Sequence, residues 1–258
     1  MKKWLFILIF TKPLMALYMG NPASPGMIEE GFFFCKENWF AVKGGYQRDW
    51  VFDRNMKAVS KISGRLDDFK CLADQGALVI NLINRIEVYG SAGAAHFFAS
   101  NRPSGSGVKQ EYQTYNQLTW GFGIRGEVYA WNQLSFGVSG KCQIARPNIK
   151  WMTTNGALVN PRDGSRVSFY EWQIGTGVSY QIDMLIPYLG VKYSNAGAHF
   201  KHLPSGFLPS GHHFKVKNRR KFGMVIGTSF STGNRFAATV ETRFIDEQSI
   251  TLAAEVRL

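Results

Sequence analysis

A glycine pattern in the middle of the chain could in principle bind a dinucleotide. Gly121, Gly123 and Gly126 have the spacing G-x-G-x-x-G. That motif binds a pyrophosphate only where a helix begins within it, so that backbone N–H groups converge on the phosphates. Here an alternation of apolar and polar residues continues through the motif to Ala130. We therefore interpret the glycines as small residues that leave space on one face of a strand, and we predict no cofactor.

The histidines are the next candidates for chemistry. His212 and His213, with His202 nearby, could bind a metal ion, but no carboxylate or cysteine lies at ligand spacing from them. Hydrolysis would require a serine, a histidine and an acid brought together, and the sequence singles out no nucleophile. We predict no metal site and no catalytic residue. A hydrolase with its site at strand ends, near His96 or His199, stays open as the weaker alternative.

Charged residues recur at alternate positions of apolar segments. Apolar side chains at 118, 120, 122 and 124 alternate with polar or small ones. The same two-residue period recurs in later segments, the last of which ends at Leu258. Only a β-strand places alternate residues on opposite faces. An apolar row toward lipid and a polar row toward a lumen are typical of an outer-membrane barrel. The charged members of the polar rows, which we predict to line the lumen, are Arg125, Glu127, Lys141, Glu171, Lys192, Arg235, Glu241, Arg243, Glu255 and Arg257.

The first sixteen residues have the features of a secretory signal peptide. Lys2 and Lys3 precede a short apolar run, and Ala16 ends a plausible cleavage site. No later stretch has the 18 or so apolar residues that a membrane helix needs, so a membrane-spanning form must be a barrel. We predict a signal peptide at 1–16 and a single barrel domain at 17–258.

Long and short connections alternate along the chain, which supports a bacterial barrel with tight turns at one end and loops at the other. The long ones lie near 100–115, 147–166 and 201–214, on the outer side if the C-terminus is periplasmic. Counting back from the C-terminus predicts about twelve antiparallel strands, with 10 to 16 possible. The expected strands are 247–258, 234–245, 215–230, 185–200, 167–181, 133–146, 116–131, 84–99 and 74–82, with weaker candidates at 49–62, 37–47 and 26–35.

The chain is strongly basic, with a formal net charge of +12. A cluster near the third long loop predicts a basic outer collar formed by Lys201, Lys215, Lys217, Arg219, Arg220 and Lys221. A positive collar and lumen would concentrate anions. The alternative is that arginine and glutamate rows pair across strands and merely hold the barrel open. A nucleic-acid partner is not expected, because no zinc spacing and no DNA-reading helix is present.

Three cysteines give an odd count for an exported protein. Cys142 lies on an apolar strand face, where a small buried hydrophobe is the simplest interpretation. Cys35 and Cys71 lie near segment ends and are the candidate pair for a disulfide.

Several motifs together resemble the chlamydial-type major outer-membrane porins. They are Leu17 to Pro25, Gly45-Tyr46 with Asp49 to Arg54, Tyr170 to Gln173 with Pro187 to Ser194, and Ala238 to Glu247. The resemblance implies a surface-exposed, immunogenic porin, in some cases a homotrimer, that passes small solutes. This chain has smaller outer loops and few cysteines, and it ends in Leu258 where an aromatic residue is typical, so a shorter paralogue fits best.

We therefore expect passive diffusion of small hydrophilic solutes across the outer membrane, with a preference for anions and with membrane lipid as the surrounding partner. The alternative is a structural or adhesive surface protein whose barrel is closed or plugged. A barrel near ten strands could be too narrow to conduct.

Overall fold

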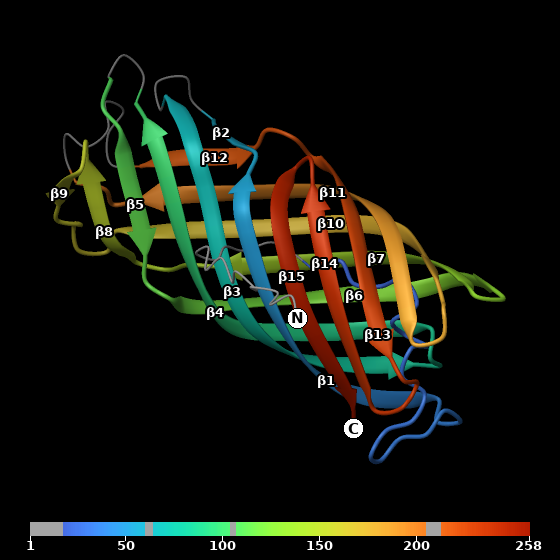
Figure 1. Cartoon of the computed structure of the whole chain (residues 1–258). Coiled ribbons are helices and arrows are strands. Elements are labelled where there is room, and N and C mark those ends of the chain that lie inside the picture. The colour runs from blue at the N-terminus through green and yellow to red at the C-terminus, as the bar shows by residue number, and fades with distance from the viewer. Residues whose placement is uncertain (1–17, 60–63, 104–106, 205–212) are drawn as a thin grey trace, which may run out of the picture.

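The protein forms a single antiparallel β-barrel in a computed structural model that describes residues 18–59, 64–103, 107–204 and 213–258. Ten strands close the barrel in the order β3-β1-β15-β14-β13-β11-β10-β7-β6-β4, and β4 pairs with β3 to complete the circle (Figure 1). Their bounds are β1 Phe40–Arg54, β3 Arg65–Leu82, β4 Ile86–Arg102, β6 Gln117–Trp131, β7 Leu134–Ala145, β10 Arg166–Tyr180, β11 Leu185–Lys201, β13 Phe222–Ser231, β14 Phe236–Phe244 and β15 Glu247–Arg257. The predicted all-β antiparallel barrel is confirmed.

Five shorter strands extend one end of this barrel. They are β2 Met56–Ala58, β5 Gln110–Thr114, β8 Ile149–Thr154, β9 Ala157–Val159 and β12 Phe214–Asn218. All of them lie within the long connections, which gather at the end opposite the C-terminus (Figure 1). We call this the loop end, and the other, where tight turns join β3 to β4, β6 to β7, β10 to β11 and β13 to β14, the turn end. The predicted alternation of long and short connections is confirmed.

The alternation of residue types explains why the barrel forms. On β15, Gln248, Ile250 and Leu252 are exposed, whereas Ser249 and Thr251 are buried. The usual relation is reversed, since apolar side chains point outward and polar ones inward, as lipid on the outside requires. The same reversal recurs on every strand of the barrel wall that carries an exposed apolar row, for instance Leu118, Phe122 and Ile124 on β6.

The β14–β15 hairpin is short and ends below the loop end. β12 passes over it and pairs with β2, so that Val216 lies opposite Ala58 and Asn218 opposite Met56. The turn residues Asp246 and Glu247 are consequently enclosed, with exposures of 0% and 1%. This places two carboxylates in the middle of the barrel interior.

The ten wall strands lie within the predicted range of 10 to 16 and below the central value of twelve, because the three weaker candidates contribute one wall strand instead of three. The two weak candidates at 37–47 and 49–62 are replaced by β1, which is continuous through the gap between them, and by the short β2. The candidate at 26–35 forms no strand, apart from one bridge between Glu30 and Asn234, and instead follows a segment that enters the barrel. The predicted signal peptide at 1–16 lies outside the described residues.

No helix in the described part of the chain is long and apolar enough to cross a membrane.

Candidate functional site in the barrel interior

The first described residues occupy the barrel interior. Residues 18–28, which we call the plug segment, are mostly buried, with Tyr18 at 6% and Met19 at 3% exposure. The segment has no regular secondary structure, so its backbone polar groups need partners from the wall. Glu241 on β14 accepts hydrogen bonds from the backbone N–H of Met19 at 3.0 Å and of Gly20 at 2.9 Å.

Other wall residues hold the rest of the plug segment along its length. The Asn21 side-chain amide donates to the Ile186 carbonyl at 2.8 Å and to Ser229 Oγ at 3.0 Å. The Lys43 ammonium donates to the Ser24 carbonyl at 2.9 Å. In separate contacts, Asn81 donates to the Pro25 carbonyl, Ser231 to the Met27 carbonyl and Arg257 to the Ile28 carbonyl, at 2.7, 2.8 and 2.8 Å. The segment is therefore bound by specific contacts to several strands.

Glycines on the inward rows make room for the plug segment. A Cβ atom added at Gly175 would lie 2.6 Å from Met19 Sδ, and one at Gly177 would lie 3.1 Å from Pro22 Cγ. A Cβ at Gly137 would lie 3.1 Å from the Pro22 Cα. Glycine is used where another backbone approaches closely, so these positions fit the segment to the wall.

Little space remains between the plug segment and the wall. The cavity among Met19, Pro22, Arg125, Gly137 and Gly175 has a volume of about 10 Å³. A cavity needs on the order of 10–15 Å³ of such volume to hold one water molecule. The described conformation is closed at this level.

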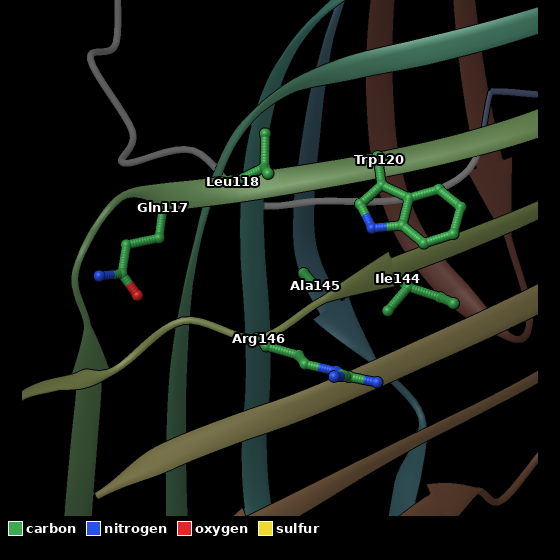
Figure 2. Close-up of a pocket in the computed structure, with 6 residues that line it drawn as sticks. All are labelled: Gln117, Leu118, Trp120, Ile144, Ala145 and Arg146. Atoms are coloured by element: carbon green, nitrogen blue, oxygen red, sulfur yellow. The ribbon is translucent and has the colours of Figure 1, made fainter. Parts of the chain in front are cut away.

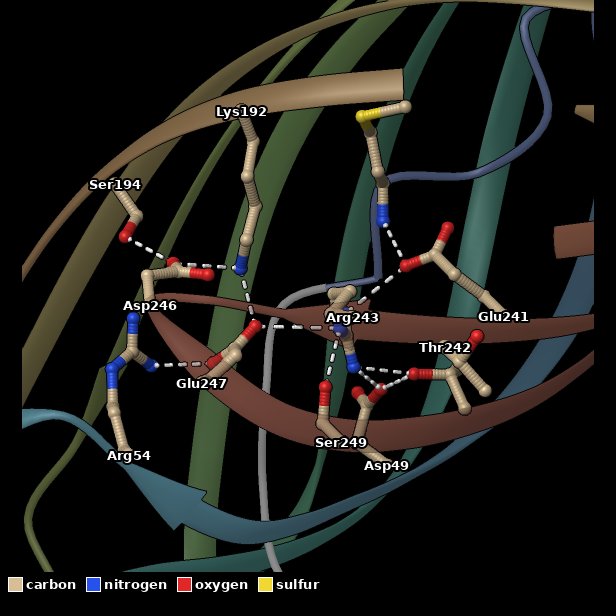
Figure 3. Close-up of polar contacts among 12 residues, drawn as sticks. Asp49, Arg54, Lys192, Ser194, Glu241, Thr242, Arg243, Asp246, Glu247 and Ser249 are labelled. Carbon is tan, nitrogen blue, oxygen red and sulfur yellow. Dashed lines mark hydrogen bonds and ion pairs between the residues drawn. The ribbon is translucent and has the colours of Figure 1, made fainter. Parts of the chain in front are cut away.

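A layer of charged side chains lies above the plug segment and begins at Arg243 (Figure 3). Arg243 on β14 lies 3.2 Å from Asp49, 3.2 Å from Glu241 and 3.3 Å from Glu247, and its Nε donates to Ser249 Oγ at 2.8 Å. All four of these charged residues are at most 1% exposed. Glu241 therefore connects the plug segment to the charged layer.

Glu247 forms the centre of the rest of this layer. Its carboxylate pairs with Lys192, and with Arg54 at 3.3 Å. Lys192 also lies 3.1 Å from Asp246 (Figure 3). Arg54 forms a two-pronged pair with Glu171, with one hydrogen bond of 2.6 Å. Strands β1, β10, β11, β14 and β15 thus meet through ion pairs in the middle of the interior.

A third group of ion pairs lies beside the plug segment, nearer the turn end. Glu87 on β4 pairs with Lys43 at 2.6 Å and with Arg125, and Arg125 also lies 2.6 Å from Glu255. A buried pair stabilises little on balance but is costly to break, because the remaining charge loses its partner. These pairs therefore fix the wall around the plug segment.

The interior charges nearly cancel. The buried cations are Lys43, Arg54, Arg125, Lys141, Lys192, Arg243 and Arg257, and the buried carboxylates are Asp49, Glu87, Glu171, Glu241, Asp246 and Glu247, joined by the 14%-exposed Glu255. Lys141 differs from most of them because no described carboxylate lies within ion-pair distance of its ammonium, which donates to Gln47 Oε1 at 3.3 Å. Its ammonium also lies 5.8 Å from the centre of the Tyr89 ring.

An apolar cluster fills the interior at the loop end. The rings of Phe97 and Phe169 lie 5.0 Å apart, those of Phe69 and Phe169 6.0 Å, and those of Phe200 and Phe214 stack at 4.4 Å. The cluster includes Met152 and Val216, and its members are at most 6% exposed. The interior is therefore closed twice, by the plug segment and by this cluster.

Eight of the ten residues predicted to line the lumen do point into the interior, as the burial of Glu241 and Arg243 illustrates. Arg235 is exposed at the turn end, immediately before β14 begins at Phe236, and its guanidinium lies 4.8 Å from the Phe32 ring centre. Glu127 is half-buried beside an irregularity in the β6–β7 pairing. Whether the eight line a conducting path stays a prediction.

The sequence pattern did not identify several interior charges. Asp49, Arg54 and Glu87 lie on inward rows of β1 and β4, but their strands lack a simple alternation of apolar and polar residues. Asp246 and Glu247 lie in the short connection from β14 to β15, where the sequence carries no sign of their burial. The plug segment carries no periodic signal, although the glycines at alternate positions 175 and 177 could have indicated a close approach.

The residues of the predicted basic collar lie on the outside of the barrel wall. Lys215 and Lys217 on β12 are exposed, whereas Phe214, Val216 and Asn218 between them are buried. Lys201 is half-buried at the end of β11, and Arg219, Arg220 and Lys221 are exposed in the connection to β13. These cations therefore lie on the outer face of one side of the barrel, at β11, β12 and the start of β13, and do not form the mouth of its lumen.

The predicted disulfide is not formed, because its two cysteines lie at different ends of the barrel. Cys35 is exposed near the turn end, where its carbonyl accepts a hydrogen bond from Arg257 at 2.8 Å. Cys71 is buried in the apolar cluster, opposite Val51 and Phe97. Both are free thiols, as is the partly exposed Cys142.

The histidines do not assemble a metal site among the described residues, since no group of three or more metal-binding side chains occurs there. The rings of His199 and His213 lie 5.5 Å apart near the loop end. His212 lies outside the described residues.

Comparison with known proteins confirms the resemblance to the chlamydial porins. Residues 149–203 match the family described as Chlamydia major outer membrane protein. The major outer membrane porin, serovar F, of Chlamydia trachomatis is 22% identical over 95% of both chains. The major outer membrane porin of Chlamydia psittaci is 21% identical over 95% of both chains. The prediction of a bacterial outer-membrane protein is likewise confirmed.

The relatives are longer than this chain. The alignment to the serovar F porin spans 376 positions, whereas this chain has 258 residues. The alignment therefore contains large gaps in the sequence of this chain.

Among solved structures, the outer membrane protease OmpT from Escherichia coli matches with a TM-score of 0.41 and 9% identity, over 84% of this chain and 92% of that one. The KdgM porin matches with a TM-score of 0.35 and 8% identity, over 83% and 98%.

Proposed function

We propose, on the premise of this resemblance to the chlamydial major outer membrane porins, that the protein is an outer-membrane porin and that the described conformation is its closed state. The relatives whose full length it matches are named porins. The observation that carries the proposal is a closed barrel with lipid-facing apolar rows outside and polar, charged rows inside between the turn end and the apolar cluster. Small hydrophilic solutes would cross by passive diffusion, without chemistry by any residue.

Conduction requires the plug segment to leave the interior. Among the described residues, the segment is continuous with the wall through residues 29–39 at the turn end, so it can move out of the interior without any strand leaving the barrel. Water can replace its hydrogen bonds, and its buried apolar contacts are confined to two small clusters around Met19 and around Met27 and Ile28. The apolar cluster at the loop end must also part. Its side chains come from the loop-end ends of wall strands β3, β4, β10 and β11 as well as from the short strands β8 and β12.

The proposal includes a preference for anions, which we now assign to a single interior cation and not to the collar and the whole lumen. The collar does not surround the lumen mouth, and most interior cations face carboxylates. Lys141 and Arg257 are the buried cations with no described carboxylate within ion-pair distance. Arg257 donates to the backbone carbonyls of Ile28 and Cys35, so Lys141 is the cation that would attract a passing anion. Assembly as a homotrimer is proposed from the resemblance alone.

Recording from the refolded full chain in a planar bilayer tests the proposal, with a variant that lacks residues 18–28 as the second sample. We expect rare openings from the full chain and frequent openings from the shortened one. In a salt gradient, the reversal potential of both should be displaced in the direction of anion selectivity. The failure of both proteins to conduct, with both folded by circular dichroism, would contradict the porin assignment.

The filled interior favours one second candidate, a structural surface protein that never opens. The specific observation is the apolar cluster, because opening would expose stacked rings such as those of Phe200 and Phe214 to water. A silent bilayer with the shortened variant supports this candidate, and conductance by that variant rules it out.

A further inference from the structure

A patch of cations lies on the outer face of one side of the barrel wall, toward the loop end. It consists of Arg146, Arg166, Lys201, Lys215 and Lys217, which we call the basic belt. Arg166 on β10 lies directly opposite Lys201 on β11. Lys215 on β12 lies opposite His199 on β11, and His199 precedes Lys201 by two residues on that strand. The belt thus crosses neighbouring strands of the wall.

The cations of the belt have no ion-pair partner among the described residues, although the surface pairs Lys109–Glu111 and Arg102–Asp67 show that the loop end contains carboxylates. On the adjacent strand, Lys57 lies directly opposite Lys217. Like charges directly opposite one another destabilise a sheet. Two such pairs, Arg166 with Lys201 and Lys57 with Lys217, indicate that an anion from outside the chain neutralises them.

The height of the belt is set by the aromatic residues on β10. Tyr170 and Tyr180 are both exposed and lie ten residues apart on the same outward row. Ten residues extend about 33 Å along a strand, or roughly 25 Å of height at the usual tilt of a barrel, which is the height of the lipid-facing band. Tyr170 therefore marks its boundary toward the loop end.

The belt begins immediately beyond that boundary. Tyr170 lies opposite Gly197, and Gly197 lies opposite Lys217. Arg166 is four residues beyond Tyr170, about 13 Å along the strand. This is the depth at which lipid head groups lie, whose phosphates bind lysine and arginine through charge-assisted hydrogen bonds.

An apolar hollow adjoins the belt on the membrane side (Figure 2). It has a volume of about 440 Å³ and lies where β6 begins and β7 ends. Leu118, Trp120, Ile144 and Ala145 line it, with Arg146 at its rim. Leu118 and Trp120 are 67% and 47% exposed. A cation above an exposed apolar hollow fits a molecule that has an anionic head and a hydrocarbon chain.

We propose that the basic belt and this hollow bind a phosphorylated lipid of the outer leaflet, with its phosphates on Arg166, Lys201 and Lys215 and an acyl chain against Leu118 and Trp120. The site is independent of conduction, because it lies on the outside of the wall. Soluble polyanions could bind the same cations, but they have no hydrocarbon chain to occupy the apolar hollow.

Native mass spectrometry of the refolded full chain in detergent tests this proposal. The probes are diphosphoryl lipid A and the dephosphorylated lipid with the same acyl chains. We expect the phosphorylated lipid to bind the wild-type protein about tenfold more tightly. The double variant Lys201→Gln with Lys215→Gln should lose about that factor for the phosphorylated lipid and keep its affinity for the other.

The matched control is Lys36→Gln with Arg85→Gln, which removes two exposed cations at the turn end and should bind both lipids as the wild type does. Circular dichroism checks that every variant is folded. Equal affinity of the wild type for the two lipids would overturn the proposal. The proposal would also be overturned if heparin bound as tightly as lipid A and displaced it, because a polyanion without an acyl chain would then be the ligand.

Discussion

The carboxylate of Glu241 on β14 accepts a hydrogen bond of 3.0 Å from the backbone N–H of Met19, which lies 222 residues earlier in the chain. The same carboxylate accepts a second bond from Gly20 and a third, of 2.8 Å, from the Tyr188 hydroxyl. One side chain of the barrel wall therefore holds the start of the plug segment in the interior.

Replacement of this carboxylate should loosen the plug segment. Glu241→Gln keeps the shape of the side chain but can no longer offer two anionic oxygens to Met19 and Gly20. A hydrogen bond to a charged group contributes about 1.5–3 kcal/mol, so the open fraction should rise at least about tenfold. Single-channel recording measures that fraction. The control Glu111→Gln removes a half-buried carboxylate that pairs with Lys109 at the loop end, and an equal rise there would sink the idea.

The fit between the plug segment and the wall can be tested at a glycine. Gly175→Ala would bring a Cβ to 2.6 Å from Met19 Sδ, a distance that requires the methionine to move. We expect a loss of thermal stability of about 1–3 kcal/mol, typical of overpacking, with an increase in channel openings.

A second substitution should reverse that effect. Met19→Ala removes the clashing atoms, so the double variant should recover most of the loss and show a coupling energy within the 0.5–3 kcal/mol range of contacting residues. Gly90→Ala is the control, since no atom lies within 4 Å of its added Cβ. Purely additive effects of Gly175→Ala and Met19→Ala would show that the two positions do not meet.

Lys141 offers the sharpest test of ion selectivity. Because no described carboxylate lies within ion-pair distance of it, Lys141→Gln removes a positive charge from the interior without leaving a directly paired anion behind. The reversal potential in a salt gradient should move toward cation preference. Arg125→Gln is a less clear test, because it leaves Glu87 and Glu255 without their shared partner. An unchanged reversal potential for a conducting Lys141→Gln channel would show that anions do not pass this residue.

The wall of the barrel was predictable from sequence because its information is local. The alternation at 118–124 or 248–258 specifies which side chains face lipid, and the same alternation at 133–146, 167–181 and 234–245 placed Lys141, Glu171 and Arg243 inside. Connection lengths likewise predicted which loops share an end. Each of these inferences needs only neighbouring residues and the two-residue period of a strand.

The contents of the barrel were not predictable in the same way. The position of the plug segment depends on Glu241, and the burial of Glu247 depends on β12 passing over a hairpin to reach β2. Both are contacts between residues far apart in the chain. The collar failed for a related reason, since a basic run indicates charge density but not which face of β12 carries it.

The central ion pairs should prove costly to break. Lys192 is fully buried between Asp246 and Glu247, so Lys192→Met leaves two carboxylates short of a cation in the interior. Loss of one partner from a buried network costs about 3–5 kcal/mol, which denaturant unfolding in lipid vesicles should register. Lys36→Met breaks a pair whose side chains are 58% and 45% exposed and should cost less than about 1 kcal/mol. The double variant Lys192→Met with Asp246→Asn should recover part of the loss, because one of the uncompensated charges is then gone. Equal destabilisation by Lys192→Met and Lys36→Met would mean that water reaches Lys192 in the folded protein and that the interior is already open at this level.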